Sequence, residues 1–227
     1  ADLSGSSLGS ADLSNSNLTG ADLSGADLTN ADLTAHFAEE EFLFLDGDGK
    51  TGLESGSVSG NPVLPSNYTL INGYIVGPDV NLTDADLSGA DLTGANLSGA
   101  DLTGADLSNS DLKDADLSHA DLAGLKSGSV LGNPVLPSNY VLINGYIFGP
   151  NVNLSNVDLT NVDLSNVDLS GLKSGSVSGD PILPSNYTLI NGYIVGPDVD
   201  LSNADLSGAN LSDADLTGAN LSNADLS

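Results

Sequence analysis

The chain has 227 residues, of which 31 are acidic and four are lysine or arginine, so its formal net charge at pH 7 is −27. Such a charge repels DNA, RNA and anionic membrane surfaces, which excludes a nucleic-acid-binding protein. Cysteine is absent, which excludes disulfides and zinc-thiolate sites, and no apolar stretch approaches the ~18 residues of a membrane-spanning helix.

A five-residue repeat, Ala-[Asp/Asn]-Leu-[Ser/Thr]-x, dominates the chain. It fills four blocks, residues 1–35, 80–124, 152–171 and 199–227. A period of five matches neither an α-helix nor a long strand, so each repeat is predicted to be a short extended segment followed by a turn. The central leucine and the small residue two places before it have the same side-chain parity and are expected to point inward. The aspartate, the serine or threonine and the fifth residue are then expected to face water.

These repeats resemble the pentapeptide-repeat family. For the repeat blocks, the resemblance implies an all-β fold, a right-handed quadrilateral β-helix with four repeats in each coil. We expect the whole chain, residues 1–227, to form a single continuous solenoid. Residues 20 apart are then neighbours in successive coils. The aspartates expected to stack in this way are Asp86 and Asp106, Asp91 and Asp111, and Asp101 and Asp121.

Three copies of a 27-residue cassette separate the repeat blocks, at residues 53–79, 125–151 and 172–198. In the first copy, Tyr68 to Ile71 and Tyr74 to Val76 are β-prone runs joined by an Asn-Gly pair, which is typical of a hairpin but also suits a solenoid corner. The cassette prolines lack the N–H of a central ladder and belong at corners. We favour an enlarged coil for each cassette, with a protruding hairpin as the alternative.

An insertion at residues 35–51 precedes the first cassette and is predicted to be a short helix followed by a loop. Within it, Asp46 and Asp48 alternate with glycine and resemble half of a calcium loop, whose oxygen ligands suit a hard cation. In that spacing Phe44 and Ser55 occupy positions where carboxylates are needed. Calcium bound by Asp46 and Asp48 is therefore one interpretation, and a plain acidic turn is the other.

The sequence favours a non-enzymatic structural or interaction protein, because neither His36 nor His119 has a partner in a recognisable catalytic arrangement. No catalytic residue and no cofactor other than calcium is expected. Both ends of the chain are in register with the repeat, so Leu3 and Leu226 are expected to be open edges that stack end to end with further coils. The partner is a second copy or the continuation of a longer chain, without insertion into a membrane.

We therefore expect a rigid acidic rod in an extracellular filament, sheath or cell-surface assembly. The alternative is a DNA mimic that binds a type II topoisomerase, a function known for some pentapeptide-repeat proteins, and the chain would then be cytoplasmic. The leucine at every repeat centre, where those proteins often have phenylalanine, counts against the alternative.

Overall fold

The computed structural model describes residues 1–13, 16, 21–29, 31, 33, 53, 55–64 and 66–227. These residues form two compact bodies. The first comprises Ala1–Leu122 with Val130–Pro137, and the second comprises Ala123–Ser129 with Ser138–Ser227. The insertion at 35–51, with Asp46 and Asp48, lies outside the described residues. The expectation of one continuous solenoid stays a prediction, and each body is described by itself.

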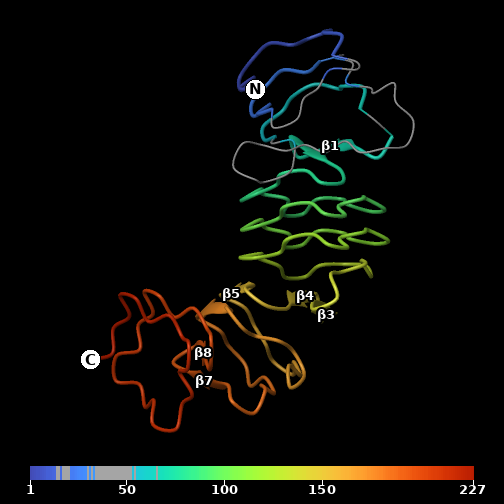
Figure 1. Cartoon of the computed structure of the whole chain (residues 1–227). Coiled ribbons are helices and arrows are strands. Elements are labelled where there is room, and N and C mark those ends of the chain that lie inside the picture. Colours follow the sequence, from blue (N-terminus) through green and yellow to red (C-terminus); the bar gives the residue numbers. More distant parts are fainter. Residues whose placement is uncertain are drawn as a thin grey trace. The chain divides into compact units, whose positions relative to one another are not determined.

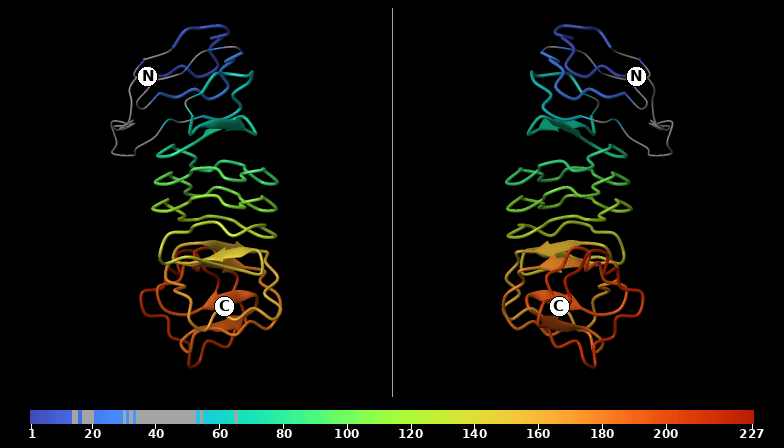
Figure 2. Two further views of the ribbon diagram at one scale, coloured as in Figure 1. Left: turned by 90° about the vertical axis from the view of Figure 1, so that its right-hand side faces the viewer. Right: turned by 90° about the vertical axis from the view of Figure 1, so that its left-hand side faces the viewer.

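In the repeat blocks of the first body, four repeats make each four-sided coil. Parallel bridges join residues 20 apart, including all three predicted aspartate pairs. The coils of residues 80–122 lie as parallel layers in Figure 1, and the two side views of Figure 2 show the same layers edge-on. The Leu82 N–H donates to the Asp101 carbonyl at 2.8 Å, and the Asp101 N–H donates to the Val80 carbonyl at 2.9 Å. Asp101 therefore uses both its backbone N–H and its backbone carbonyl to bond its coil to the preceding one.

The turn at each corner explains which residues occupy the fifth position of the repeat. The Ala90 N–H donates back to the Leu87 carbonyl at 3.1 Å, and Gly89 between them has φ +66°. A positive φ at the third residue of a four-residue turn defines a type II turn, which favours glycine or asparagine. Glycine, asparagine or aspartate fills this position in most repeats, and His119 adopts it with φ +63°.

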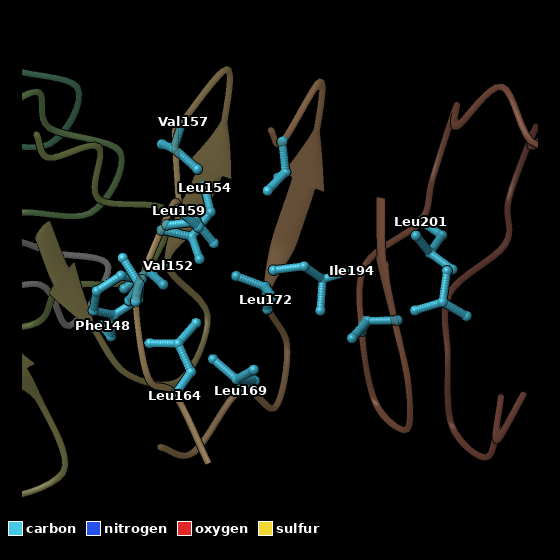
Figure 3. Packing of buried hydrophobic residues seen from close by; sticks show 14 of the residues in the cluster. Phe148, Val152, Leu154, Val157, Leu159, Leu164, Leu169, Leu172, Ile194 and Leu201 are labelled. Carbon is cyan, nitrogen blue, oxygen red and sulfur yellow. The ribbon is translucent and has the colours of Figure 1, made fainter. Parts of the chain in front are cut away.

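The inward residues are those that the repeat pattern predicts. Leu87, Leu92 and Leu102 are completely buried, and the alanines two places earlier in each of these repeats are also buried. Burial of one leucine side chain contributes roughly 2 kcal/mol. In the second body, valine replaces alanine at Val152, Val157 and Val162, and these side chains share one core with Phe148 and the inward leucines. In Figure 3, Phe148, Val152 and Leu164 point into the space that the chain encloses.

Among the described residues there are four strand pairs, of which three are antiparallel hairpins, one in each cassette, and the fourth is a parallel pair that joins two coils. The hairpins are β1 (Thr69–Ile71) with β2 (Tyr74–Val76), β3 (Val141–Ile143) with β4 (Tyr146–Phe148), and β7 (Thr188–Ile190) with β8 (Tyr193–Val195). The parallel pair is β5 (Asn153–Ser155) with β6 (Lys173–Gly175). In the first hairpin, Asn72 and Gly73 both have positive φ, +50° and +83°, as a type I′ turn requires.

Each cassette is an enlarged coil, and its hairpin is part of that coil. The Asp200 N–H donates to the Leu172 carbonyl at 2.8 Å, so the chain from one partner to the other includes the whole third cassette and is longer than a coil of four repeats. The second strand of each hairpin is packed into the core, because Ile75, Ile147 and Ile194 are at most 1% exposed. The protruding hairpin is therefore wrong. The additional length of the cassette is accommodated because the hairpin folds back against the coil.

Candidate interaction surface

The outer face of the repeat blocks carries aspartates whose side chains are tied to their own turns. Asp86 Oδ1 accepts the Ser88 N–H at 3.1 Å and the Ser88 hydroxyl at 2.6 Å. Asn96 makes the same two bonds with Ser98, at 3.0 and 2.6 Å. The pattern [Asp/Asn]-Leu-[Ser/Thr] is thus an Asx turn, in which a side-chain oxygen accepts a backbone N–H two residues later.

These hydrogen bonds also favour the ionised form of the carboxylates. The hydroxyl and then the backbone N–H of Thr93 hold the pKa of Asp91 below its usual range. The same direction and causes apply to Asp158, with Thr160, and to Asp205, with Ser207. The three carboxylates are fully exposed, so Asp91, Asp158 and Asp205 keep their negative charge at every pH above the ordinary aspartate range.

Asparagine relieves repulsion between stacked carboxylates. Neighbours in a parallel ladder lie ~4.8 Å apart, where two charges in water repel by roughly 0.9 kcal/mol before salt screening. Asn220 stacks on Asp200 and donates from Nδ2 to its Oδ1 at 2.9 Å, which replaces a repulsion with a hydrogen bond. In the first body, Asn81 and Asn96 likewise stack on aspartates. The columns are therefore acidic but interrupted.

We expect Asp106→Ala to lower the free energy of unfolding by about 1 kcal/mol, since its Oδ1 accepts the Ser108 N–H at 2.9 Å. Asp106→Asn keeps that acceptor and removes the repulsion from Asp86, so it should be neutral or slightly stabilising. Urea unfolding followed by circular dichroism measures both changes. Equal destabilisation by alanine and asparagine would show that the charge, and not the turn, is what matters at this position.

Tyrosines connect each hairpin to the backbone around it. The Tyr74 hydroxyl accepts the Asp86 N–H at 3.1 Å, and Tyr193 does the same for Asp205 at 3.1 Å. A second tyrosine in each cassette donates to a proline carbonyl ten residues later, Tyr68 to Pro78, Tyr140 to Pro150 and Tyr187 to Pro197, at 3.0 to 3.2 Å. These bonds satisfy backbone groups where the hairpin interrupts the ladder between coils.

Exposed aliphatic side chains interrupt the acidic surface at one equivalent position of each cassette. Val63, Val135 and Ile182 are all more than half exposed, and each follows the first proline of a Pro-[Val/Ile]-Leu-Pro motif. Their backbones pair with the neighbouring coil at the position that an aspartate occupies in a regular repeat, as the bridge between Asp163 and Ile182 shows. Sequence reasoning missed these residues. The signal was the aliphatic residue at an outward, proline-flanked position.

The predicted assembly edges differ in their surroundings. Leu3 is half-buried and packs against the core of the first body, and its N–H donates to the Asp22 carbonyl at 2.8 Å. Leu226 is 53% exposed. In the last coil, at positions 208–227, the leucine N–H groups that would donate to a following coil have no hydrogen-bond partner among the described residues, namely those of Leu211, Leu216, Leu221 and Leu226. This coil therefore presents an open ladder edge.

His119 is exposed, and His36, Asp46 and Asp48 lie outside the described residues. Within the part of the chain that the structure describes, no group of three or more histidine, aspartate or glutamate side chains could hold a metal ion. The same residues include no helix of the length and apolarity needed to cross a bilayer. The interpretation of Asp46 and Asp48 as calcium ligands stays a prediction.

The family model for pentapeptide repeats matches eight copies, over residues 1–34, 81–118, 150–172 and 198–227. Among solved structures, a pentapeptide repeat protein, Rfr23, from the cyanobacterium Cyanothece 51142 is 26% identical, with a TM-score of 0.26. That alignment covers 55% of this chain and 63% of the other, so the match spans less than two thirds of that protein. No curated protein sequence matches the chain.

HetL, a pentapeptide repeat protein involved in heterocyst differentiation regulation in the cyanobacterium Nostoc sp. strain PCC 7120, is 27% identical over 97% of this chain and 86% of its own, with a TM-score of 0.23. QnrB1, a plasmid-mediated fluoroquinolone resistance protein, is 16% identical over 96% and 91%, with a TM-score of 0.24. Scores this low carry no argument about function. Together with the family match, the ladder between successive coils confirms the predicted right-handed quadrilateral β-helix.

Proposed function

Because the chain belongs to the pentapeptide-repeat family, we propose that it is a non-enzymatic structural protein whose coils stack end to end into a longer acidic solenoid. One observation carries the proposal, the open ladder edge at positions 208–227. Its leucines are half-buried or exposed, whereas leucines inside the repeat blocks, such as Leu102 and Leu107, are completely buried. A further coil of the same repeat matches this edge in both hydrogen bonding and apolar side chains.

The energetic balance favours stacking in a salt-containing solution. Complete burial of a leucine side chain contributes about 1.5–3 kcal/mol, and the edge offers four that are incompletely buried. The opposing term is repulsion between acidic surfaces, which salt screens over a Debye length of about 10 Å at 0.1 M. Stacking is therefore expected to strengthen with ionic strength. We propose an extracellular filament, sheath or cell-surface assembly as the place of the protein.

Leu226→Glu tests the proposal, because it places a charge on the stacking edge. We expect the unmodified chain to form oligomers that grow with concentration and salt, and we expect Leu226→Glu to reduce that association at least tenfold. Leu131→Glu is the matched control, since Leu131 is 60% exposed on a lateral face and stacks in the aspartate column beside Asp111. It should leave association unchanged.

Sedimentation velocity at two salt concentrations measures the association, and electron microscopy of stained particles shows whether they elongate. A chain that stays monomeric at high concentration and high salt contradicts the proposal. So does association that Leu226→Glu leaves intact and Leu131→Glu removes, because lateral contacts would then hold the particles together.

A second candidate is a DNA mimic that binds a type II topoisomerase in the cytoplasm, favoured by the columns of exposed aspartates in successive coils. The chain would then compete with DNA for the enzyme, with a strong dependence on salt. Inhibition of supercoiling by the wild-type chain, weakened in a variant with Asp86, Asp106 and Asp91 changed to asparagine, would support it. Equal inhibition by both chains would show that these aspartates do not mediate binding to the topoisomerase.

A further inference from the structure

A polar groove lies between the first cassette hairpin and the coil that follows it. Its volume is about 440 Å³, within the ~300–1,000 Å³ range of small-molecule sites. One wall comes from the hairpin region, including Tyr68, Ile71 and Val76, and the other from Asp91 to Asn96. All of these residues belong to the first body.

The groove exists because the hairpin replaces part of a regular coil. Paired residues in the repeat blocks are 20 apart. At that spacing, Ile71 would pair with Asp91, and Val76 would pair with Asn96. In the cassette, Ile71 pairs with Tyr74 across the hairpin instead. The backbone N–H groups of Asp91 and Asn96 therefore have no hydrogen-bond partner among the described residues. They lie at an open ladder edge that lines the groove.

Side chains add complementary hydrogen-bonding groups beside those two donors. Asp91 uses Oδ1 for the Thr93 N–H at 3.1 Å, which leaves its second carboxylate oxygen as an acceptor. Asn96 uses Oδ1 for Ser98, so its amide nitrogen remains as a donor. The Tyr68 hydroxyl is bonded to Pro78 at 3.2 Å, which leaves the half-buried ring as the contact surface of this residue.

This combination fits a ligand rich in hydroxyl groups. A hydroxyl accepts from a backbone N–H and donates to a carboxylate at the same time, and an aromatic ring packs against the apolar face of a sugar. The described residues that line the groove include no lysine or arginine, and both Asp91 and the net charge of −27 disfavour anions. We propose that the groove beside the first hairpin binds a neutral oligosaccharide.

The same two ladder positions are open after the other cassettes. They are Asp163 and Asp168 after the second, and Asn210 and Asp215 after the third, and their N–H groups likewise lack a partner among the described residues. Aspartate replaces Asn96 at both equivalent positions, Asp168 and Asp215. Of the three equivalent positions, Asn96 beside the groove is therefore the one with an amide donor.

Titration of the ¹⁵N-labelled chain with cellotriose, and separately with maltotriose, tests the proposal by NMR. We expect at least one of these neutral trisaccharides, at millimolar concentration, to shift the backbone amide signals of Asp91 and Asn96. Trigalacturonic acid, which carries carboxylates, should bind at least tenfold more weakly. The absence of any shift at these two amides with both neutral sugars, or an equal response to the acidic one, overturns the proposal.

Thr93→Lys provides the blocking variant, because a lysine side chain would fill the groove. Lys113 stands at the same repeat position one coil later, so the fold accepts lysine there. The variant should weaken binding at least tenfold. Ser108→Lys places a lysine at the same repeat position outside the groove, so it is the matched control and should bind as the unmodified chain does. Undiminished binding by a folded Thr93→Lys chain would place the sugar elsewhere and contradict the assignment.

Discussion

Replacing Leu102 with alanine is expected to lower the free energy of unfolding by about 3 kcal/mol, whereas the same change at Leu131 should cost less than about 0.5 kcal/mol. Leu102 is completely buried, and Leu131 is 60% exposed. The walls around Leu102 are held by hydrogen bonds to the coils before and after, such as that from the Leu102 N–H to the Asp121 carbonyl at 2.8 Å. The cavity left by the truncation therefore has little freedom to collapse.

Urea unfolding followed by far-UV circular dichroism compares the two variants with the unmodified chain. Stacked coils contact only their neighbours, so the destabilisation by Leu102→Ala should be local. We expect a lower urea midpoint for the unfolding of the first body and an unchanged midpoint for the second. Equal losses at Leu102 and Leu131 would contradict the assignment of the leucines to an inward and an outward position.

Gly77→Ala is the second change with a large expected effect, about 3 kcal/mol of destabilisation. A Cβ atom at Gly77 would overlap the ring of Tyr68, which packs against this glycine, and Gly149 with Tyr140 and Gly196 with Tyr187 repeat the arrangement. The ring would have to leave its site and lose its bond to the Pro78 carbonyl. Gly9→Ala is the control, because its Cβ would make only an ordinary contact with Thr29.

The pKa of Tyr68 reports the displacement directly. Burial, with a smaller contribution from the Asp79 charge, raises it to about 12, against roughly 10 in an unfolded chain. The unfolded state therefore loses its proton first, and the stability that this tyrosine contributes is complete below pH ~10 and declines as pH rises towards about 12. In Gly77→Ala the pKa should fall towards 10 and this decline should shrink. An unchanged pKa, measured by ¹³C NMR of labelled tyrosine, would show that the ring stays in place.

The hairpins illustrate a partial success of sequence reasoning. The Asn-Gly pair at 72 and 73 predicts the turn, because both residues readily adopt the positive φ values observed. Whether the hairpin protrudes or folds inward depends on the coil beside it. Ser55 decides this in the first cassette, since its buried hydroxyl accepts the Ile75 N–H at 2.8 Å across a long separation in sequence.

The aspartates were predicted correctly in position but not in role. Their exposure and their stacking between successive coils follow from the repeat, while their bonds to the serine or threonine two residues later were missed. The signal was local, because [Asp/Asn]-Leu-[Ser/Thr] has the spacing of an Asx turn. The glycine, asparagine and aspartate of the fifth position were likewise a local sign of the type II turn.

The period of five, the inward leucines and the enlarged cassettes could be read from the sequence, because each depends on interactions within a few residues or on strict repetition. The groove beside the first hairpin and the open amides of Asp91 and Asn96 could not. They arise where a hairpin meets the next coil of the chain, and only the tertiary structure decides which backbone groups find partners there. Hydrogen bonding between coils joins residues far apart in the sequence. Two repeats of identical sequence can therefore differ in whether their backbone N–H groups are paired, because the adjacent coil differs.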